Sequence, residues 1–395
     1  MPAPLLRILI VEYFCAGGGG ARLPAGLLTE AGGILQAAVE DFSTLPGACV
    51  LTLTRSRLRV RLAPPHQVRD VHPGRFAAAF GRALREVDAA LVVAPERDGT
   101  LLRLTRAIER AGVTNLGSSA AAVRVASDKW LTHLALERAG VPQPRTLRVP
   151  ARGGAVRQAA ARVSGWNGRT RVLSARRRPA PQPGWIIKPV DGYACLGLSE
   201  VRLPGEDRPG RGGWTGRTPS GSTLSALRSA VRAAARHSKR AHILVQERCA
   251  GVDASVCLVG NGKRAAPLLL NGQRIARLGG FGAAARFKYA GGFAPLSHRQ
   301  ARAALEAARR VAEGIPGLRG YFGVDLILQE NGVRVVDVNP RLTSSYLLLR
   351  RLAPHNPASW ILEAVCRGRL PGRFAATHRV ETWLKSSAGT SAASI

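Results

Sequence analysis

Two acidic residues and an asparagine interrupt an apolar stretch that otherwise has the pattern of a buried β-hairpin. Asp325 lies in "GVDLILQENG", and Asp337 and Asn339 lie in "RVVDVNPR". Residues i and i+2 of a strand share a face, so Asp337 and Asn339 point the same way. Carboxylate and carboxamide oxygens are hard ligands that suit Mg²⁺, which also binds phosphate oxygens. The three side chains therefore indicate a magnesium site. The alternative is a pair of solvated acids on an exposed sheet face, with Asn-Pro ending the strand.

The face that Asp325 occupies depends on the turn of this hairpin. A two-residue turn at 331–332 would set Asp325 opposite Val338, on the wrong face. A three-residue loop at 330–332, with its glycine in the left-handed region, sets Asp325 opposite Asp337. We expect the second register, or a five-residue loop of the same parity.

Basic residues near these acids could complete a phosphate site. Arg341 stands two residues beyond Asn339 and shares its side if the strand persists, where it could hold a carboxylate or a transferring phosphoryl group. Lys188 ends an apolar run in "GWIIKPVDGYACLG", and a lysine before a glycine-containing loop can cover a triphosphate. Lys129, near a helix start, could reach the same phosphates. The alternatives are a plain β-turn and a solvent-exposed lysine.

Arginine is the default cation of this chain. Lysine and arginine number 58 against 25 acidic residues, a formal net charge of +33, yet only six residues are lysines. A nucleic-acid-binding protein gathers its charge on one face and interleaves aromatic residues. Here the arginines are spread along the chain and aromatic residues make up 5%. The pattern argues against a nucleic-acid partner, and the charge could instead attract an acidic substrate or an anionic cofactor.

Cysteine usage and hydropathy indicate a cytoplasmic protein. Six cysteines occur without CxxC spacing, which favours neither a zinc site nor a disulfide framework. The longest apolar runs have the length of strands, so no membrane partner is expected. The start, "MPAPLLRILIVEY", has the pattern of a first core strand rather than a secretory signal. A homodimer is one assembly that the chain could form.

The elements that must position these residues begin with an α/β domain over about residues 1–118. We expect strands at 5–12, 49–55 and 89–96, and helices at 24–42, 75–88 and 100–112. Alternation of strands and helices is typical of a parallel sheet. The glycine run Gly17 to Gly20 could bring backbone N–H groups to a substrate carboxylate, or form a tight turn.

Beyond residue 118 we expect two α+β subdomains and a tail. The first, 119–245, starts with helices on either side of Asp128-Lys129 and holds the lysine-containing strand and loop. The second, 246–380, has an antiparallel sheet, a helix at 297–315 and the hairpin with the acids, and 381–395 is expected to be a flexible tail. Residues 151–183 have weak periodicity, and residues 203–222 have the composition of a loop.

Four stretches, in order, resemble the ATP-grasp superfamily of carboxylate–amine ligases. They are "SDKWLTHLALERAGVPQP", "IIKPVDGYACLGL", "LVQERCAGVDASV" and "GVDLILQENGVRVVDVNPR". The resemblance implies an ATP-grasp fold, with an N-terminal parallel α/β domain followed by two α+β subdomains that clasp ATP. More narrowly, "VEYFCAGGGG", "APERDGTL", "PLLLNGQ" and "DVNPRLTSSY" resemble the ligases that join tyramine to L-glutamate in methanofuran biosynthesis, and their relatives in methylotrophic bacteria.

The resemblance also implies a role for each matching residue. Magnesium, or Mn²⁺ in its place, would be held by Asp325, Asp337 and Asn339. ATP would be bound by Lys129 and Lys188, by Asp191, Gly192 and Gly197 of the phosphate loop, by Gln246, Glu247, Arg248 and Cys249 of a hinge strand beside adenine, and by Asp253 at the ribose. The catalytic cations would be Lys188, Lys288 and Arg341, with Lys288 contacting a phosphate and Arg341 facing the acyl phosphate.

The implied reaction is ADP-forming amide synthesis from a small-molecule carboxylate and an amine. ATP phosphorylates the carboxylate, and the amine then displaces phosphate from the acyl phosphate. Asp337 stands where the family usually has glutamate, and Tyr193 to Cys195 stand where small loop residues are common. The alternatives are a D-alanyl-ligase-like peptide ligase and a basic nucleotide- or nucleic-acid-binding protein without ligase activity.

Overall fold

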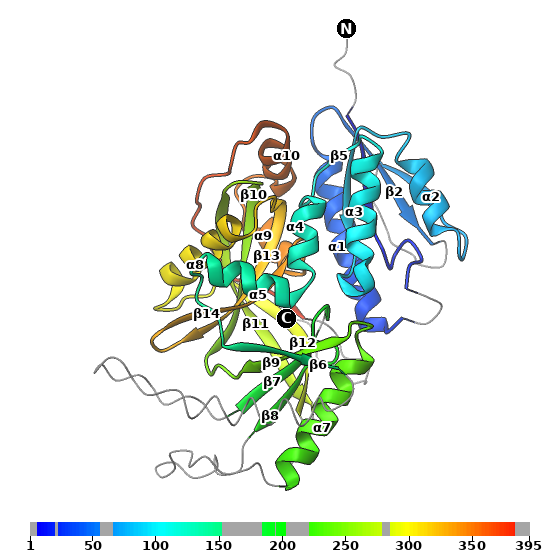
Figure 1. Ribbon diagram of the computed structural model, residues 1–395. Helices are drawn as coiled ribbons and strands as arrows, with labels where there is room; N and C mark the ends of the chain where they lie inside the picture. The colour runs from blue at the N-terminus through cyan, green and yellow to red at the C-terminus, as the bar shows by residue number, and fades with distance from the viewer. Residues whose placement is uncertain are drawn as a thin grey trace, which may run out of the picture.

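A computed structural model describes residues 6–19, 23–55, 66–151, 184–193, 195–202, 221–278 and 285–383. Nearly all of the stretches expected to be irregular, 151–183 and 203–222, lie outside the described residues. The part of the chain that is described forms two sheets with helices on their faces (Figure 1).

The first sheet is parallel and contains five strands in the order β3-β2-β1-β4-β5. They are β1 (Leu6–Glu12), β2 (Ala48–Thr54), β3 (His66–Asp70), β4 (Ala89–Val93) and β5 (Thr114–Asn115). Helix α1 (Ala25–Ser43) covers one face, and α2 (Phe76–Ala83) and α3 (Thr100–Arg110) cover the other, with the short turn η1 (Arg97–Gly99) before α3. The expected parallel α/β domain is confirmed, and β3 is an edge strand that the sequence pattern missed.

Alternation along β1 explains how this sheet is buried on both faces. Ile8 and Ile10 pack in the cluster that contains α1, whereas Leu9 and Val11 pack in the cluster that contains α2 and α3. All four side chains are fully buried. A central parallel strand must be apolar on both faces, and "ILIV" meets that requirement. The polar residue Glu12 ends the strand, where the chain leaves the sheet.

The second sheet is antiparallel, with the strand order β14-β13-β10-β11-β12-β8-β7-β9-β6 and β15 added beside β12. One half holds β6 (Thr146–Pro150), β7 (Gly184–Pro189), β8 (Ser199–Arg202) and β9 (His242–Glu247), covered by α7 (Gly221–Arg236). The other half holds β10 (Val252–Asn261), β11 (Ala265–Leu278), β12 (Ala285–Ala294), β13 (Arg319–Gln329) and β14 (Gly332–Asn339), covered by α8 (Ala301–Gly314). Each half has its own apolar cluster, and β8 pairs with β12 to join them.

Two predicted boundaries need correction. Helix α4 (Ala120–Ala126) packs on α3 and helix α5 (Lys129–Arg138) packs on α8, and their buried residues Ala122, Ala126 and Leu136 belong to the α8 cluster, whereas Val123 belongs to the α3 cluster. They therefore lie with the C-terminal half of the large sheet, although the predicted subdomain 119–245 grouped them with the lysine loop. The predicted tail 381–395 starts too early, because β15 (Val380–Trp383) pairs with β12.

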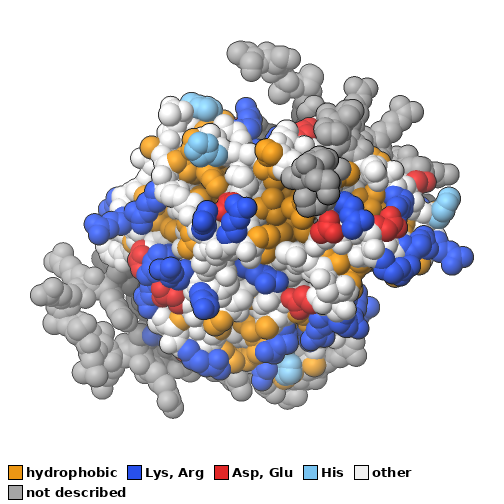
Figure 2. All heavy atoms as spheres, turned by 90° about the horizontal axis from the view of Figure 1, so that it is seen from above, with side chains coloured by type: hydrophobic (Ala, Val, Ile, Leu, Met, Phe, Trp, Pro, Cys, Tyr) orange, Lys and Arg blue, Asp and Glu red, His pale blue; other side chains and the backbone are white. Residues whose placement is uncertain are grey.

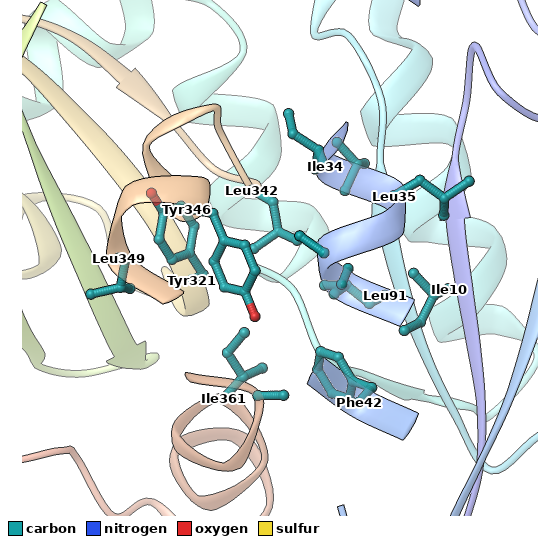
Figure 3. Packing of buried hydrophobic residues seen from close by; sticks show 14 of the residues in the cluster. Ile10, Ile34, Leu35, Phe42, Leu91, Tyr321, Leu342, Tyr346, Leu349 and Ile361 are labelled. Atoms are coloured by element: carbon teal, nitrogen blue, oxygen red, sulfur yellow. The ribbon is translucent and has the colours of Figure 1, made fainter. Parts of the chain in front are cut away.

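A shared core joins the two sheets. Helices α9 (Ser345–Leu352) and α10 (Pro357–Arg367) pack against α1, and Figure 3 shows Tyr346 and Ile361 facing Ile34 and Phe42 across this junction. The Tyr346 hydroxyl donates to Asp41 Oδ2 at 2.7 Å. Arg350 forms an ion pair with the same carboxylate at 2.7 Å, so polar contacts accompany the apolar packing at this junction.

Surface charge is dispersed on the face that Figure 2 shows. Basic side chains are spread around its rim and centre, with acidic and hydrophobic groups among them (Figure 2). Within the described ranges, no helix is long and apolar enough to cross a membrane.

Candidate active site

A cavity of about 640 Å³ lies between the parallel sheet and both halves of the antiparallel sheet. Its walls come from the end of β1, from α1, and from strands β7, β9, β10, β13 and β14. Most of the residues predicted for the site line it: Lys129, Lys188, Gly192, Gln246, Glu247, Arg248, Cys249, Asp253, Asp325, Asp337, Asn339 and Arg341. The chain thus brings residues more than 200 positions apart into one cavity.

The three predicted metal ligands converge on the β13–β14 hairpin. Asp325 pairs with Asp337 in register, and Asn339 pairs with Gly323 two positions along. The amide nitrogen of Asn339 donates to Asp325 Oδ2 at 3.0 Å, and Gln273 Nε2 donates to Asp325 Oδ1 at 3.0 Å. Because the nitrogen of Asn339 is used in this way, its carbonyl oxygen is left as the ligand atom.

The expected pairing is present, but the predicted turn is wrong. Gln329 pairs with Gly332, so the turn has two residues, 330 and 331, in place of the predicted three-residue loop. A β-bulge follows at Val336, where one extra residue shifts the register and restores Asp325 opposite Asp337. The bulge gives the parity that a three-residue loop would have given.

The bulge also supplies a partner for Lys188. The ammonium of Lys188 donates to the carbonyl oxygen of Val336 at 3.0 Å. Lys188 is only 5% exposed, and burial lowers its pKa to about 8, although the carboxylate of Asp337 opposes the shift. A lysine held this way is a compact charge that gains strongly from an anionic ligand.

Lys129 begins α5 directly beside the predicted metal ligands. The carboxylate of Asp128 caps the helix by accepting from the N–H groups of Trp130 and Leu131. The Lys129 ammonium forms an ion pair with Asp337, and its backbone N–H donates to Val190 O, at the start of the phosphate loop, at 2.8 Å. Burial alone would lower the pKa of Lys129, but the carboxylate of Asp337 raises it above the usual value.

Burial and the neighbouring Asp337 raise the pKa of Asp325 to about 6. Two carboxylates in one low-dielectric site repel each other, so the pair favours a cation between them. No group of three or more His, Cys, Asp and Glu side chains that could hold a metal occurs among the described residues. An ion at this site would be held by two carboxylates and one carboxamide of the chain, and water or a ligand would supply its other oxygens.

Comparison with known proteins agrees with this geometry. Residues 218–345 match the ATP-grasp domain family, and residues 49–123 match the pre ATP-grasp 3 domain family. The chain therefore contains an ATP-grasp domain preceded by a pre ATP-grasp domain. A solved ATP-grasp superfamily protein from Archaeoglobus fulgidus superposes with a TM-score of 0.58 at 23% identity, covering 90% of this chain and 87% of that one. D-Alanine–D-alanine ligase from Bacillus anthracis gives 0.58 at 12% identity, covering 92% and 98%.

Two curated relatives are tyramine–L-glutamate ligases. The protein from Methanocaldococcus jannaschii is 27% identical over 259 residues, which is 66% of this chain and 57% of that protein. The protein from Methanocaldococcus fervens is 27% identical over 260 residues, 66% of this chain and 60% of that protein. The matched part of the chain thus spans less than two thirds of these relatives.

The strand expected to flank adenine in an ATP-grasp protein is β9 with the residues after it. The Gln246 side chain is buried and donates to Thr146 Oγ1 at 2.9 Å, so it holds β6 to β9. Arg248 forms an ion pair with the buried Glu200 at 2.5 Å. These side chains support the strand, which leaves its backbone and the half-buried Glu247 to face the cavity. Burial raises the pKa of Asp253, also on the wall.

Three of the predicted residues do not line the cavity. Lys288 is exposed, because its neighbours Phe287 and Tyr289 line the cavity and residue 288 points to the opposite face of β12. Asp191 is buried behind the phosphate loop and accepts from the Asp98 N–H at 3.2 Å. Gly197 lies in that loop with a φ of +75°, and a Cβ there would lie 2.9 Å from His237 Cβ.

Arg341 lines the cavity and forms an ion pair with Glu96 that the sequence analysis did not predict. Strand β14 ends at Asn339, so strand alternation does not decide on which side Arg341 lies. The guanidinium binds both oxygens of Glu96, from the chain before η1, at 2.8 and 3.2 Å. The pair crosses from the antiparallel sheet to the parallel domain and closes one end of the cavity.

Several wall residues were missed by the sequence analysis. They are Glu12, Glu30, Gln273, Tyr289 and Ser344. A signal existed for Glu12, because an acid that ends a buried parallel strand stands at the edge where such sheets bind ligands. Gln273 carried no signal, since its role depends on the pairing of β11 with β10 and β12.

Proposed function

We propose that the protein is an ATP-dependent carboxylate–amine ligase that forms an amide through an acyl phosphate. The observation that carries the proposal is the convergence of Asp325, Asp337 and Asn339 with two buried lysines in one cavity of an ATP-grasp fold. A structural ion-pair network would pair these groups among themselves. Among the residues that the structure describes, Lys188 is hydrogen-bonded to the Val336 carbonyl and forms no ion pair, which leaves its charge available to a phosphate.

The donor set fits magnesium bound to ATP. Asp325, Asp337 and Asn339 would hold the metal, with Mn²⁺ as an alternative, and phosphate oxygens would complete its coordination. When bound, the metal neutralises charge on the phosphates during transfer. Lys129 and Lys188 would contact the phosphates, residues 246–249 would flank adenine, and Asp253 would hold the ribose. The described residues of the loop, 190–193 and 195–198, would cover the phosphates and exclude water from the acyl phosphate.

Phosphoryl transfer would take place beside Arg341. A substrate carboxylate oriented by its guanidinium attacks the γ-phosphorus, and ADP leaves. The amine nitrogen then attacks the acyl carbon, the carbon–oxygen bond to phosphate breaks, and the nitrogen loses a proton. No side-chain nucleophile is needed, which agrees with the raised pKa values of about 12 that burial gives the thiols of Cys195 and Cys249.

The substrates that we propose are L-glutamate and an aromatic amine such as tyramine. The support is the similarity to the two tyramine–L-glutamate ligases, which covers 66% of this chain. Such a reaction would place the protein in the biosynthesis of a methanofuran-like cofactor. A cytoplasmic location and a homodimer remain predictions, and size-exclusion chromatography with light scattering tests the latter.

The test is release of ADP from Mg·ATP with glutamate alone, with tyramine alone and with both. We expect turnover only with both substrates, together with γ- or α-glutamyltyramine by mass spectrometry. Asp337→Ala should abolish turnover while its circular dichroism spectrum stays the same. Turnover with D-alanine in place of both substrates would indicate a peptide ligase instead. A wild-type protein that binds ATP without turning over any acid and amine pair would contradict the ligase.

A further inference from the structure

One wall of the cavity is a helix face that carries a single carboxylate. Four residues of α1 line it: Leu27, Glu30, Ala31 and Ile34. Their spacing of i, i+3, i+4 and i+7 places them on one side of the helix. Phe14, after β1, extends the apolar surface and stacks on Tyr193 of the phosphate loop with ring centroids 6.1 Å apart. This wall therefore offers apolar contact to a ligand.

Glu12 faces this wall without a counter-charge. Its side chain lines the cavity and is only 3% exposed. One oxygen, Oε2, accepts from the Cys15 N–H at 2.7 Å. The Cys15 thiol and the Phe14 N–H also donate to this carboxylate, but in the part of the chain that is described it forms no ion pair with a lysine, arginine or histidine. Burial raises the pKa of this carboxyl to about 7.

Glu30 also lacks an ion-pair partner among the described residues. The hydroxyl of Ser344 is hydrogen-bonded to its carboxylate, and burial raises its pKa while Arg341 lowers it. Arg341 cannot neutralise Glu12 and Glu30 fully, because its guanidinium already binds Glu96 through two hydrogen bonds. The end of the cavity near α1 thus has negative charge in excess.

We propose that this end of the cavity is the subsite for the acceptor amine, whose ammonium group is bound by Glu12 and Glu30 and whose apolar body lies on the α1 face. Buried carboxylates without counter-ions are costly, and an ammonium ligand removes that cost. The inference rests on the proposed ligase function and adds a substrate class to it: primary amines that bind protonated and carry an apolar or aromatic body.

The amino acid substrate fits this end less well. Glutamate also has an ammonium group, but it brings carboxylates that Glu12 and Glu30 would repel. Its carboxylates are better placed toward Arg341 and the lysines, at the nucleotide end. The two substrates would then approach the acyl carbon from opposite ends of the cavity.

Calorimetric titration tests the subsite without turnover. Tyramine, phenethylamine and isoamylamine would each be compared with the alcohol that has a hydroxyl group in place of the amine. We expect wild-type protein to bind tyramine at least about tenfold more tightly than its alcohol, since a charge-assisted contact is worth about one order of magnitude. Glu12→Gln and Glu30→Gln should each remove most of this preference. Glu137→Gln, on the exposed side of α5, should leave it unchanged.

Hydroxylamine separates this inference from the ligase proposal. As a small neutral nucleophile it traps an acyl phosphate as a hydroxamate without using an ammonium subsite. We expect both glutamine variants to form hydroxamate from Mg·ATP and glutamate at the wild-type rate, while the KM for tyramine rises about tenfold. Absence of hydroxamate in the wild type would overturn the ligase proposal, and the titration would still decide the subsite.

Two results would overturn the subsite. One is wild-type protein that binds none of the three amines more tightly than its alcohol. The other is a raised KM for glutamate with an unchanged KM for tyramine in both variants, which would assign the carboxylates to the acid substrate.

Discussion

Lys188→Met should make the protein more stable while it abolishes activity. The pKa of Lys188 falls from 10.5 to about 8 in the folded chain. At 1.36 kcal/mol for each pKa unit, the buried charge costs roughly 3 kcal/mol at pH 7. Methionine removes that cost, but it leaves the Val336 carbonyl without its donor, which costs about 1 kcal/mol. We expect a net gain of about 2 kcal/mol in unfolding free energy.

The size of this stability difference changes with pH in a defined window. The folded pKa lies below the unfolded one, so between pH 8 and 10.5 the unfolded chain binds more protons than the folded chain. The wild-type protein therefore gains stability as pH rises through this window, and the advantage of Lys188→Met disappears. Below pH 8 the advantage is fully present.

Urea unfolding at pH 7 and pH 10, without nucleotide and with EDTA, measures both effects. Lys263→Met is the matched control, because Lys263 is exposed in the turn between β10 and β11, and it should change stability by less than about 0.5 kcal/mol. If Lys188→Met is less stable than the wild-type protein at pH 7, then the buried ammonium of Lys188 does not destabilise the fold as its surroundings indicate. ADP release should be lost in Lys188→Met and kept in Lys263→Met.

Two further substitutions test the metal site and the domain junction. Asp337→Asn keeps the shape of the side chain and removes its charge, so ATP turnover should fall at least about a hundredfold. EDTA should have the same effect on the wild-type protein. Full activity in either experiment would show that the reaction does not need a metal at this site. Tyr346→Phe removes the hydrogen bond to Asp41 and should lower the unfolding free energy by about 1–2 kcal/mol in thermal denaturation, with substrate KM values unchanged.

The convergence of Asp325, Asp337 and Asn339 could be predicted from the sequence because strand alternation is a local property. Asp337 and Asn339 share a face whatever the turn does, and the pairing with Asp325 needs only the right parity. The turn itself was wrong because a bulge at Val336 has no reliable signature in residue types. Two errors of one residue each, in the turn and at the bulge, compensated for one another.

Long-range pairing could not be predicted in the same way. Arg341 binds Glu96 across 245 residues, and nothing near either residue indicates the other. The prediction that Lys288 lies in the site was wrong for a related reason. An irregularity in the pairing of β12 with β11, at Arg274 and Ile275, decides which face of β12 lines the cavity. A shift of one residue in this register would turn residue 288 into the cavity and residues 287 and 289 away from it.

Because Lys129 forms an ion pair with Asp337, loss of the Lys129 charge should change the affinities for the metal and for the nucleotide in opposite directions. In the protein without ligands, the Lys129 ammonium occupies a carboxylate that the metal also needs. A magnesium ion must displace it or share it, which weakens binding of the ion alone. ATP supplies phosphates that attract the ammonium instead, so lysine and metal no longer compete when the nucleotide is present.

Lys129→Met should therefore bind free Mg²⁺ more tightly and ATP more weakly. An unscreened neighbouring charge of this kind changes affinity by about tenfold, and we expect that factor in each direction. Calorimetric titration of Mg²⁺ without nucleotide, and of ATP with Mg²⁺ present, gives the two constants. Lys239→Met is the control: Lys239 is largely exposed and 3.9 Å from Asp98, so neither constant should change. If Lys129→Met weakens both ligands, then Lys129 orders the carboxylates for the metal and does not compete with it.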